Sequence, residues 1–75
     1  MTERITFDYR KLRGRIVEVY GTGKAFAEAN KIGRAWLSKK LADGSSLRQE
    51  EMMMFAKALD IPETEYSDYF FTPKV

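Results

Sequence analysis

The sequence predicts an all-α fold, a compact domain of five short helices, and leaves room for a short terminal strand pair. Two observations indicate this class. Apolar residues recur at the spacing of a helix face along most of the chain, and glycines and capping residues divide that pattern into short segments. The chain has 75 residues and no repeat, low-complexity segment or linker, so residues 1–75 are expected to form one domain with a small core.

The first helix follows a short alternating stretch. In RITFDY, at positions 4–9, apolar and polar residues alternate, which suits a strand that ends at Asp8. The carboxylate of Asp8 can cap the helix that we expect over 9–20. Gly21 then ends this helix as a left-handed residue.

A four-residue break separates the second helix from the third. Thr22 is a suitable N-cap for a helix over 23–29, and residues 30–33 interrupt the periodicity. A third helix is expected over 34–41.

The last two helices are predicted from capping residues and proline. Ser46 and Gln49 fit a capping box, which opens a fourth helix over 47–59. A proline suits the first turn of a short fifth helix over 62–66. The aromatic stretch over 66–71 is expected to close the core and can pair with the first strand.

Charge is divided unequally along the chain. Residues 1–41 hold ten Lys or Arg and four Asp or Glu, a net charge of +6, whereas residues 42–75 hold three and seven, a net charge of −4. The first part is therefore suited to contact a polyanion. The cations over 10–15, on the first helix, are expected to form a solvated face outside the binding site.

The composition excludes several kinds of chemistry. The chain has no Cys and no His, so it lacks thiolate nucleophiles, imidazole bases and the usual zinc and haem ligands. No carboxylate pair stands out as an acid–base set, so we expect no enzyme, small-molecule substrate, metal or cofactor. No apolar run is long enough for a membrane span, and the opening MTER lacks the order of a secretion signal, which predicts an intracellular protein without a membrane partner.

The stretch GTGKAF, at positions 21–26, has the look of a phosphate-binding loop but fails its requirements. Glu18 occupies the position of the first Gly of a Walker loop, and Ala25 occupies that of the hydroxyl residue that binds magnesium. Such a loop also needs a parallel sheet, which this helical pattern does not supply. A nucleotide-binding function is therefore rejected.

The segment over 22–41 fits a helix-turn-helix, because two short helices are joined by a tight turn and the second has an exposed basic face. Ile32, Leu37 and Leu41 would pack inward, which turns the opposite face of the third helix outward. Cations on that face can bond guanine in the major groove, and hydroxyls near the helix ends can contact phosphates. The residues expected to bind DNA are Thr22, Lys24, Arg34, Ala35, Ser38, Lys39 and Ser45.

Three large apolar side chains are candidates for a protein interface. Trp36 lies on a flank of the third helix, which is more typical of a protein interface than of base reading. In the run MMM, Met52 belongs to the inward stripe of the fourth helix, whereas Met53 and Met54 point elsewhere. These two are either adaptable packing or part of a partner surface.

The stretches ITFDYRKLRGRIVEVYGT, KAFAEANKIGRAWLSKKL and IPETEYSDYFFTPK carry a family resemblance over nearly the whole chain. They resemble the Cro-like small phage regulators of the repressor-type (lambda repressor-like) helix-turn-helix family. The resemblance implies a five-helix domain in the cytoplasm of a bacterial host that regulates a lysis–lysogeny switch. It also implies that the domain binds double-stranded operator DNA through its third helix, often as a homodimer.

Four positions depart from that family. Gly23 stands where these proteins usually begin the second helix with a Gln that touches phosphate, Asn30-Lys31 replaces a frequent Leu-Gly, and Gly33 replaces a Ser cap. Asn tolerates the left-handed conformation better than other non-glycine residues, so we expect Asn30 to preserve the turn. With Trp36, these departures motivate an alternative function, an antirepressor or modulator that binds the cognate phage repressor protein, rather than or together with DNA.

Overall fold

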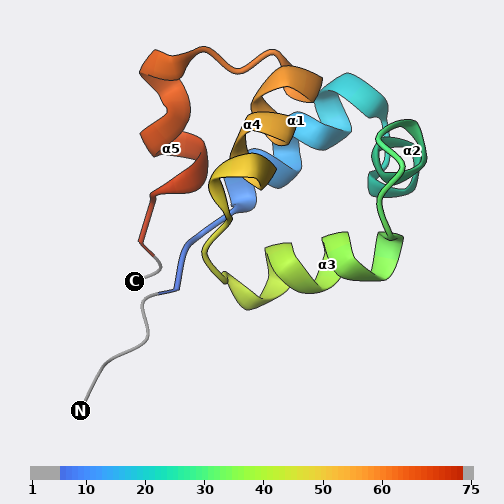
Figure 1. The fold of residues 1–75 in the computed structure, drawn as a ribbon, viewed down its shortest axis with the longest axis horizontal. Helices are drawn as coiled ribbons and strands as arrows, with labels where there is room; N and C mark the ends of the chain where they lie inside the picture. Colours follow the sequence, from blue (N-terminus) through green and yellow to red (C-terminus); the bar gives the residue numbers. More distant parts are fainter. Residues whose placement is uncertain (1–5, 74–75) are drawn as a thin grey trace.

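The predicted all-α class is confirmed by the computed structural model, which describes residues 6–73. No strand is present among these residues. The helical elements are α1 (Arg10–Tyr20), α2 (Gly23–Ala29), α3 (Arg34–Asp43), α4 (Gln49–Leu59), the 3-10 turn η1 (Glu63–Glu65) and α5 (Tyr66–Phe70). α1 and α4 lie together in the middle, α2 and α5 lie on opposite sides of them, and α3 runs along one edge (Figure 1).

A row of three aromatic rings forms the centre of the core. Phe26 of α2, Phe55 of α4 and Phe70 of α5 are almost fully buried, and Leu12 and Ile16 of α1 are buried as well. The rings of Phe26 and Phe55 stack with their centroids 5.5 Å apart, and those of Phe55 and Phe70 are 6.5 Å apart. Burial of each ring stabilises the fold by about 1.5–3 kcal/mol, so this row ties α2, α4 and α5 together.

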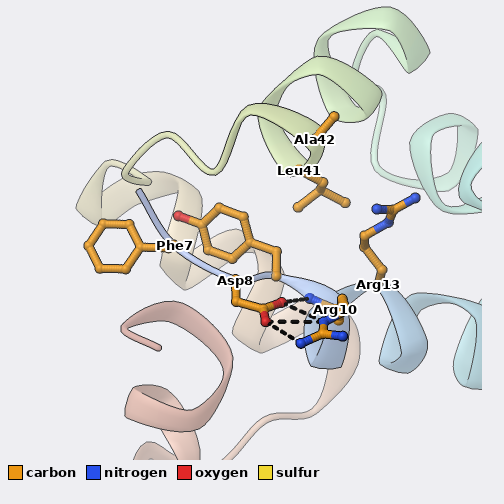
Figure 2. A pocket seen from close by; sticks show the side chains of 7 residues that line it. Phe7, Asp8, Arg10, Arg13, Leu41 and Ala42 are labelled. Carbon is orange, nitrogen blue, oxygen red and sulfur yellow. Dashed lines mark hydrogen bonds and ion pairs between the residues drawn. The ribbon is translucent and has the colours of Figure 1, made fainter. Parts of the chain in front are cut away.

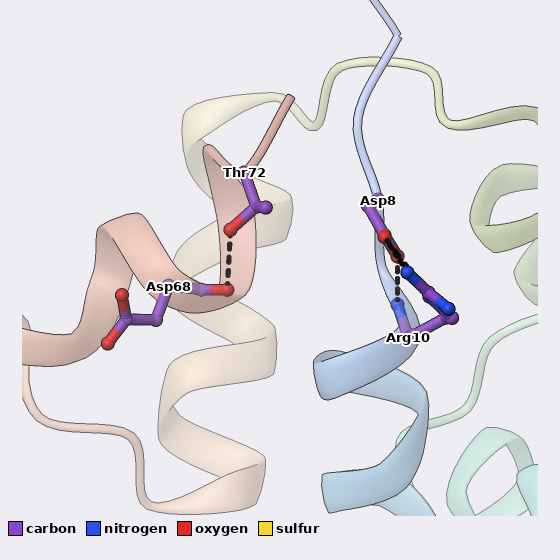
Figure 3. A network of polar contacts seen from close by, with 4 residues as sticks. All are labelled: Asp8, Arg10, Asp68 and Thr72. Carbon is purple, nitrogen blue, oxygen red and sulfur yellow. Dashed lines mark hydrogen bonds and ion pairs between the residues drawn. The ribbon is translucent and has the colours of Figure 1, made fainter. Parts of the chain in front are cut away.

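Asp8 binds the start of α1, as its predicted capping role requires, but the helix begins at Arg10, one residue later than expected, and the N-cap position is held by Tyr9. The backbone N–H of Arg10 donates to Oδ1 of Asp8 at 3.0 Å, and its guanidinium pairs with the same carboxylate at 2.8 Å (Figure 3). The pKa of Arg10 is raised, mainly by the hydrogen bond to Asp8 and to a lesser extent by the negative charge of Asp8. At the C-terminal end Gly21 has the expected positive φ, 87°, but its ψ of −46° lies outside the left-handed helical region.

The turn between α2 and α3 corrects the prediction for Asn30. The left-handed residue is Lys31, with φ 56°, whereas Asn30 has φ −101°. The N–H groups of Lys31 and Ile32 donate to two carbonyls in the last turn of α2, at 3.3 and 3.0 Å. These are the two hydrogen bonds of a Schellman motif, which requires the left-handed residue one position after the C-cap. Asn30 is that C-cap, and its side-chain amide donates to a further carbonyl of α2 at 2.9 Å.

The other ends of α2 and α3 are also set locally. Thr22 caps α2 as predicted, because its Oγ1 accepts a hydrogen bond from the N–H of Ala25 at 3.0 Å. α3 continues to Asp43, two residues beyond the expected 34–41, and ends at Gly44, which has a left-handed φ of 68°. 

The predicted capping box of Ser46 and Gln49 is wrong. α4 begins at Gln49, and Arg48 holds the N-cap position. The backbone N–H of Arg48 donates to Oε1 of Glu51 at 2.7 Å. Leu47 is buried in the core. Leu47 therefore lies in the extended segment before the helix, and α4 starts two residues later than predicted.

The C-terminal part corrects the prediction of a fifth helix over 62–66. A single 3-10 turn follows Pro62, and α5 comes after it. Tyr66, Tyr69 and Phe70 recur at helical spacing, and a helix buries Tyr69 and Phe70 together, whereas a strand would turn these neighbours to opposite faces. The prediction that aromatic residues close the core is confirmed for these two.

The two ends of the described chain lie side by side. Phe7 and Pro73 form a single antiparallel bridge, and the N–H of Asp8 donates to the carbonyl of Thr72 at 2.8 Å. The hydroxyl of Thr72 donates to the carbonyl of Asp68 at 2.9 Å, which holds this segment to α5 (Figure 3). Within residues 6–73 the expected strand pair is reduced to this bridge, and the start of the RITF stretch lies outside the described residues.

Candidate nucleic-acid and protein interfaces

α3 turns two leucines to the core and a polar face outward, as predicted. Leu37 and Leu41 are buried, and Ile32 in the preceding turn packs against the core. The α3 residues expected to contact DNA are all exposed to solvent; they are Arg34, Ala35, Ser38 and Lys39.

Four of the residues expected to bind DNA share one surface hollow of about 400 Å³. The residues that line it are Thr22, Gly23, Lys24, Arg34, Leu37 and Ser38. The hollow lies between the start of α2 and the first half of α3, so the turn between these helices brings the four side chains together. Ala35 and Lys39 lie farther around α3 and do not line it.

Ser45 is not part of that hollow, because it follows the opposite end of α3. Its backbone carbonyl accepts a hydrogen bond from the hydroxyl of Tyr9 at 2.6 Å. Tyr9 is buried, and this burial is the main reason that the pKa of its phenol is raised; the negative charge of Glu51 raises it further. The backbone of Ser45 is therefore fixed to the core, and its half-buried side chain stands apart from Thr22 and Lys24.

Arg13 approaches α3 from α1, which the sequence pattern did not indicate. Figure 2 shows it beside Leu41 and Ala42, at a hollow of about 410 Å³ that the paired Asp8 and Arg10 also line. Arg13 lines a smaller hollow of about 200 Å³ with Ser38 as well. It is exposed, as expected for the cations over 10–15, but only the folded chain reveals that its neighbours belong to α3.

The cations on this side of the molecule are available to an anionic partner. Among residues 6–73 no ion pair is formed by Arg13, Lys24, Arg34 or Lys39. In contrast, a carboxylate pairs with each of Arg10, Lys11, Arg15 and Lys40. Unpaired cations can neutralise phosphates without breaking an existing contact.

Another hollow, of about 460 Å³, lies between α3 and the first turns of α4. The residues that line it are Ile32, Gly33, Trp36, Glu50, Glu51 and Met54. Trp36 and Met54 are half-buried, so the structure brings together two of the three residues expected at a protein interface. Met53 is 61% exposed but does not line this hollow.

The hollow between α3 and α4 has acidic residues that the sequence analysis did not select. Glu51 is held by Lys40, whose Nζ lies 3.7 Å from its carboxylate and 6.0 Å from the ring centroid of Trp36. Glu50 is exposed and forms no ion pair within residues 6–73. A correct start for α4 would have placed both glutamates in its first turn, where carboxylates are favoured.

Two further observations concern the part of the chain that the structure describes. None of its helices is long and apolar enough to cross a membrane. None of its clusters of Asp and Glu has three or more groups placed to hold a metal ion.

Comparison with known proteins decides the family. A family model described as "Protein of unknown function (DUF739)" matches residues 5–73. The chain belongs to the DUF739 family. Comparison of this DUF739 chain with curated proteins gives no match.

The fold of this DUF739 chain is similar to a solved phage protein. One match is the solution structure of the modulator of repression (MOR) of the temperate bacteriophage TP901-1 from Lactococcus lactis. The TM-score is 0.75 at 30% sequence identity, and the match covers 88% of this chain and 89% of that one. It supports the resemblance to small phage regulators, whereas the narrower assignment to the Cro-like class stays a prediction.

Proposed function

We propose that this DUF739 chain is a modulator of phage repression that acts by binding a phage repressor protein. The observation that carries the proposal is the similarity to the MOR structure, at 30% identity over 88% of this chain and 89% of that one. The match therefore extends over almost all of both chains.

Gly23 supports a protein partner. The Cro-like regulators usually carry at this position a Gln that touches phosphate, and Gly23 has no side chain to replace it. The hollow between α2 and α3 therefore lacks one of the contacts that fix such a domain on the DNA backbone.

Co-elution tests this proposal. The purified chain is mixed, without DNA, with the repressor encoded in the same phage genome and is passed over a size-exclusion column with light scattering. We expect an earlier peak that contains both proteins. Its mass should equal that of a complex of the chain with the repressor. A repressor from an unrelated phage controls for nonspecific attraction between charges, and unchanged elution of both cognate proteins would contradict the proposal.

Binding of operator DNA is the second candidate function, and the unpaired cations favour it. In this function α2 and α3 form a helix-turn-helix, and α3 enters the major groove, with a homodimer on two half-sites. Lys24 and Arg34 lie at one hollow and Lys39 on the outward face, where they can meet phosphates and base edges. The two functions are compatible, because Arg34 and Trp36 line different hollows on different flanks of α3.

A titration with operator DNA at several salt concentrations tests the second candidate. Specific binding should weaken steeply as salt rises, and Arg34→Ala or Lys39→Ala should each cost about 1–3 kcal/mol of binding free energy. Equal affinity for operator and unrelated DNA at low salt would exclude specific operator binding.

A further inference from the structure

We propose that the hollow between α3 and α4 is where the repressor docks, through a helix that presents an apolar side chain with a Lys or Arg beside it. The inference rests on the proposed function and adds to it a surface and the chemistry of the partner. Three features of the hollow support it: its apolar lining, its unpaired carboxylate and its place between two helices.

The lining of the hollow offers a large apolar anchor. Trp36 and Met54 are half-buried and both line it, with Ile32 at the turn before α3. The exposed parts of these side chains would leave water on binding, which stabilises a complex by about 25 cal/mol for each Å² covered. Trp is a frequent anchor of protein interfaces, and the flexible thioether of Met adapts to the shape of a partner.

The charge of the hollow selects a basic partner. Glu51 is already engaged, since it accepts the N–H of Arg48 at 2.7 Å and lies 3.7 Å from Nζ of Lys40. Glu50, by contrast, is exposed and has no ion-pair partner within residues 6–73. A Lys or Arg of the partner would find in Glu50 a carboxylate that no other described residue neutralises.

The position of the hollow favours a protein helix over DNA. A groove between two helices matches the mode in which a partner helix lays its apolar face against apolar side chains. The carboxylates of Glu50 and Glu51 would repel phosphates. The cations Arg34 and Lys24 that could attract DNA line the other hollow, between α2 and α3.

Charge and polarity changes within the hollow test the proposal in the full-length chain. Glu50→Lys reverses the unpaired charge at an exposed position, and Met54→Lys places a charge in the apolar lining. Met53→Lys is the matched control for the second change, because Met53 is the preceding residue of α4 and lies outside the hollow. Glu28→Lys is the control for the first, at an exposed position on α2. Circular dichroism verifies that each variant is folded.

The readout is the dissociation constant for the cognate repressor, measured by calorimetry, together with the emission of Trp36, the only Trp of the chain. We expect Glu50→Lys and Met54→Lys to weaken binding about tenfold or more and the two controls to change it less than about threefold. We also expect the emission of Trp36 to shift to shorter wavelength on binding, as the indole loses water.

The outcomes separate the two claims. Absence of binding by the wild-type chain would overturn both the proposed function and this inference. Wild-type binding that survives Glu50→Lys and Met54→Lys would overturn the inference alone and leave the proposed function standing. Self-association of the wild-type chain that these two changes abolish would identify a second copy as the occupant and would also overturn the inference.

Discussion

Gly44 is the glycine whose surroundings leave the least room for a side chain. Its φ is 68°, and a Cβ placed on it would lie 2.5 Å from the carbonyl oxygen of Phe7. Its own carbonyl accepts the N–H of Phe7 at 2.8 Å, which holds the first described segment against the end of α3. We expect Gly44→Ala to lower the free energy of unfolding by about 2–4 kcal/mol, because it adds left-handed strain and displaces this segment.

Urea denaturation measures that change, with Gly14→Ala as its control. Gly14 lies in the middle of α1, and a Cβ there would meet no atom within 4 Å. Alanine should therefore stabilise the helix by about 0.5–1 kcal/mol at this position. Equal effects of the two substitutions would contradict the close approach at Gly44.

Tyr9 makes stability depend on alkaline pH. Burial raises the pKa of this phenol above its ordinary value of 10.0, so the unfolded chain releases the proton first. The contribution of the protonated Tyr9 to the free energy of unfolding is complete below about pH 10. It is lost as pH rises through the pKa that Tyr9 has in the folded state. We expect Tyr9→Phe to cost about 1–2 kcal/mol at neutral pH, since the carbonyl of Ser45 loses its donor, and to reduce the alkaline loss.

Urea unfolding at a series of pH values up to about 11 follows this loss. Tyr66→Phe serves as the control, because Tyr66 is half-buried and its hydroxyl makes no hydrogen bond within residues 6–73. If the free energy of unfolding falls as steeply with rising pH in Tyr9→Phe as in the wild type, the loss of stability comes from groups other than Tyr9.

Gly23 has room for the side chain that the Cro-like regulators carry. A Cβ on Gly23 would lie 3.9 Å from Cδ2 of Leu37, an ordinary contact. If the second candidate function holds, Gly23→Gln should strengthen operator binding about three- to tenfold at low salt through one added phosphate contact. Fluorescence anisotropy with labelled operator measures this, and binding of the repressor should stay as it was. An unchanged affinity for DNA would count against α2 as a backbone-contacting helix.

At the scale of the element, the turn between α2 and α3 stores strain at Lys31. A lysine in the left-handed region costs about 1 kcal/mol relative to glycine. We therefore expect Lys31→Gly to raise the free energy of unfolding by about 1 kcal/mol while the Schellman hydrogen bonds persist. Thermal unfolding measures the gain. Lys31→Ala removes the same charge but keeps the strained φ, so a similar gain in both variants would contradict this explanation.

The helix ends show which boundaries a sequence can reveal. Thr22 caps α2 through an N–H three residues away, and Asp8 accepts the N–H of Arg10 two residues away, so both contacts were predictable, although the N-cap of α1 is Tyr9. The start of α4 depends on burial of Leu47, and α5 depends on burial of Tyr69 and Phe70 against distant helices. Local patterns do not contain that information.

At the scale of the molecule, α3 separates two candidate surfaces. Its outward residues were predictable, because the buried Leu37 and Leu41 fix its rotation. The elements on either side of it were not, since only packing brings Arg13 near its second half and Glu50 near Trp36. The sequence therefore reveals the members of each surface on α3, together with Thr22, Lys24 and Met54, and omits Arg13, Glu50 and Glu51.

The two surfaces should respond differently to salt. Operator binding by the cations around α3 would release counterions and weaken steeply between about 0.05 and 0.2 M salt. Docking at the apolar hollow with one free carboxylate should weaken only about severalfold over that range, because most of its stabilisation is apolar. Calorimetry with the repressor across these salt concentrations checks this. A steep loss of repressor binding would show that charge, and not the apolar lining, dominates that contact.

The central claim is that a repressor protein is the partner of this chain. The most direct test titrates the chain in parallel into labelled repressor and labelled operator DNA, at about 0.15 M salt, and follows anisotropy. The account predicts saturable binding to the repressor and, over the same concentrations, weaker or absent binding to the operator. Specific binding to the operator with no binding to the repressor would contradict it.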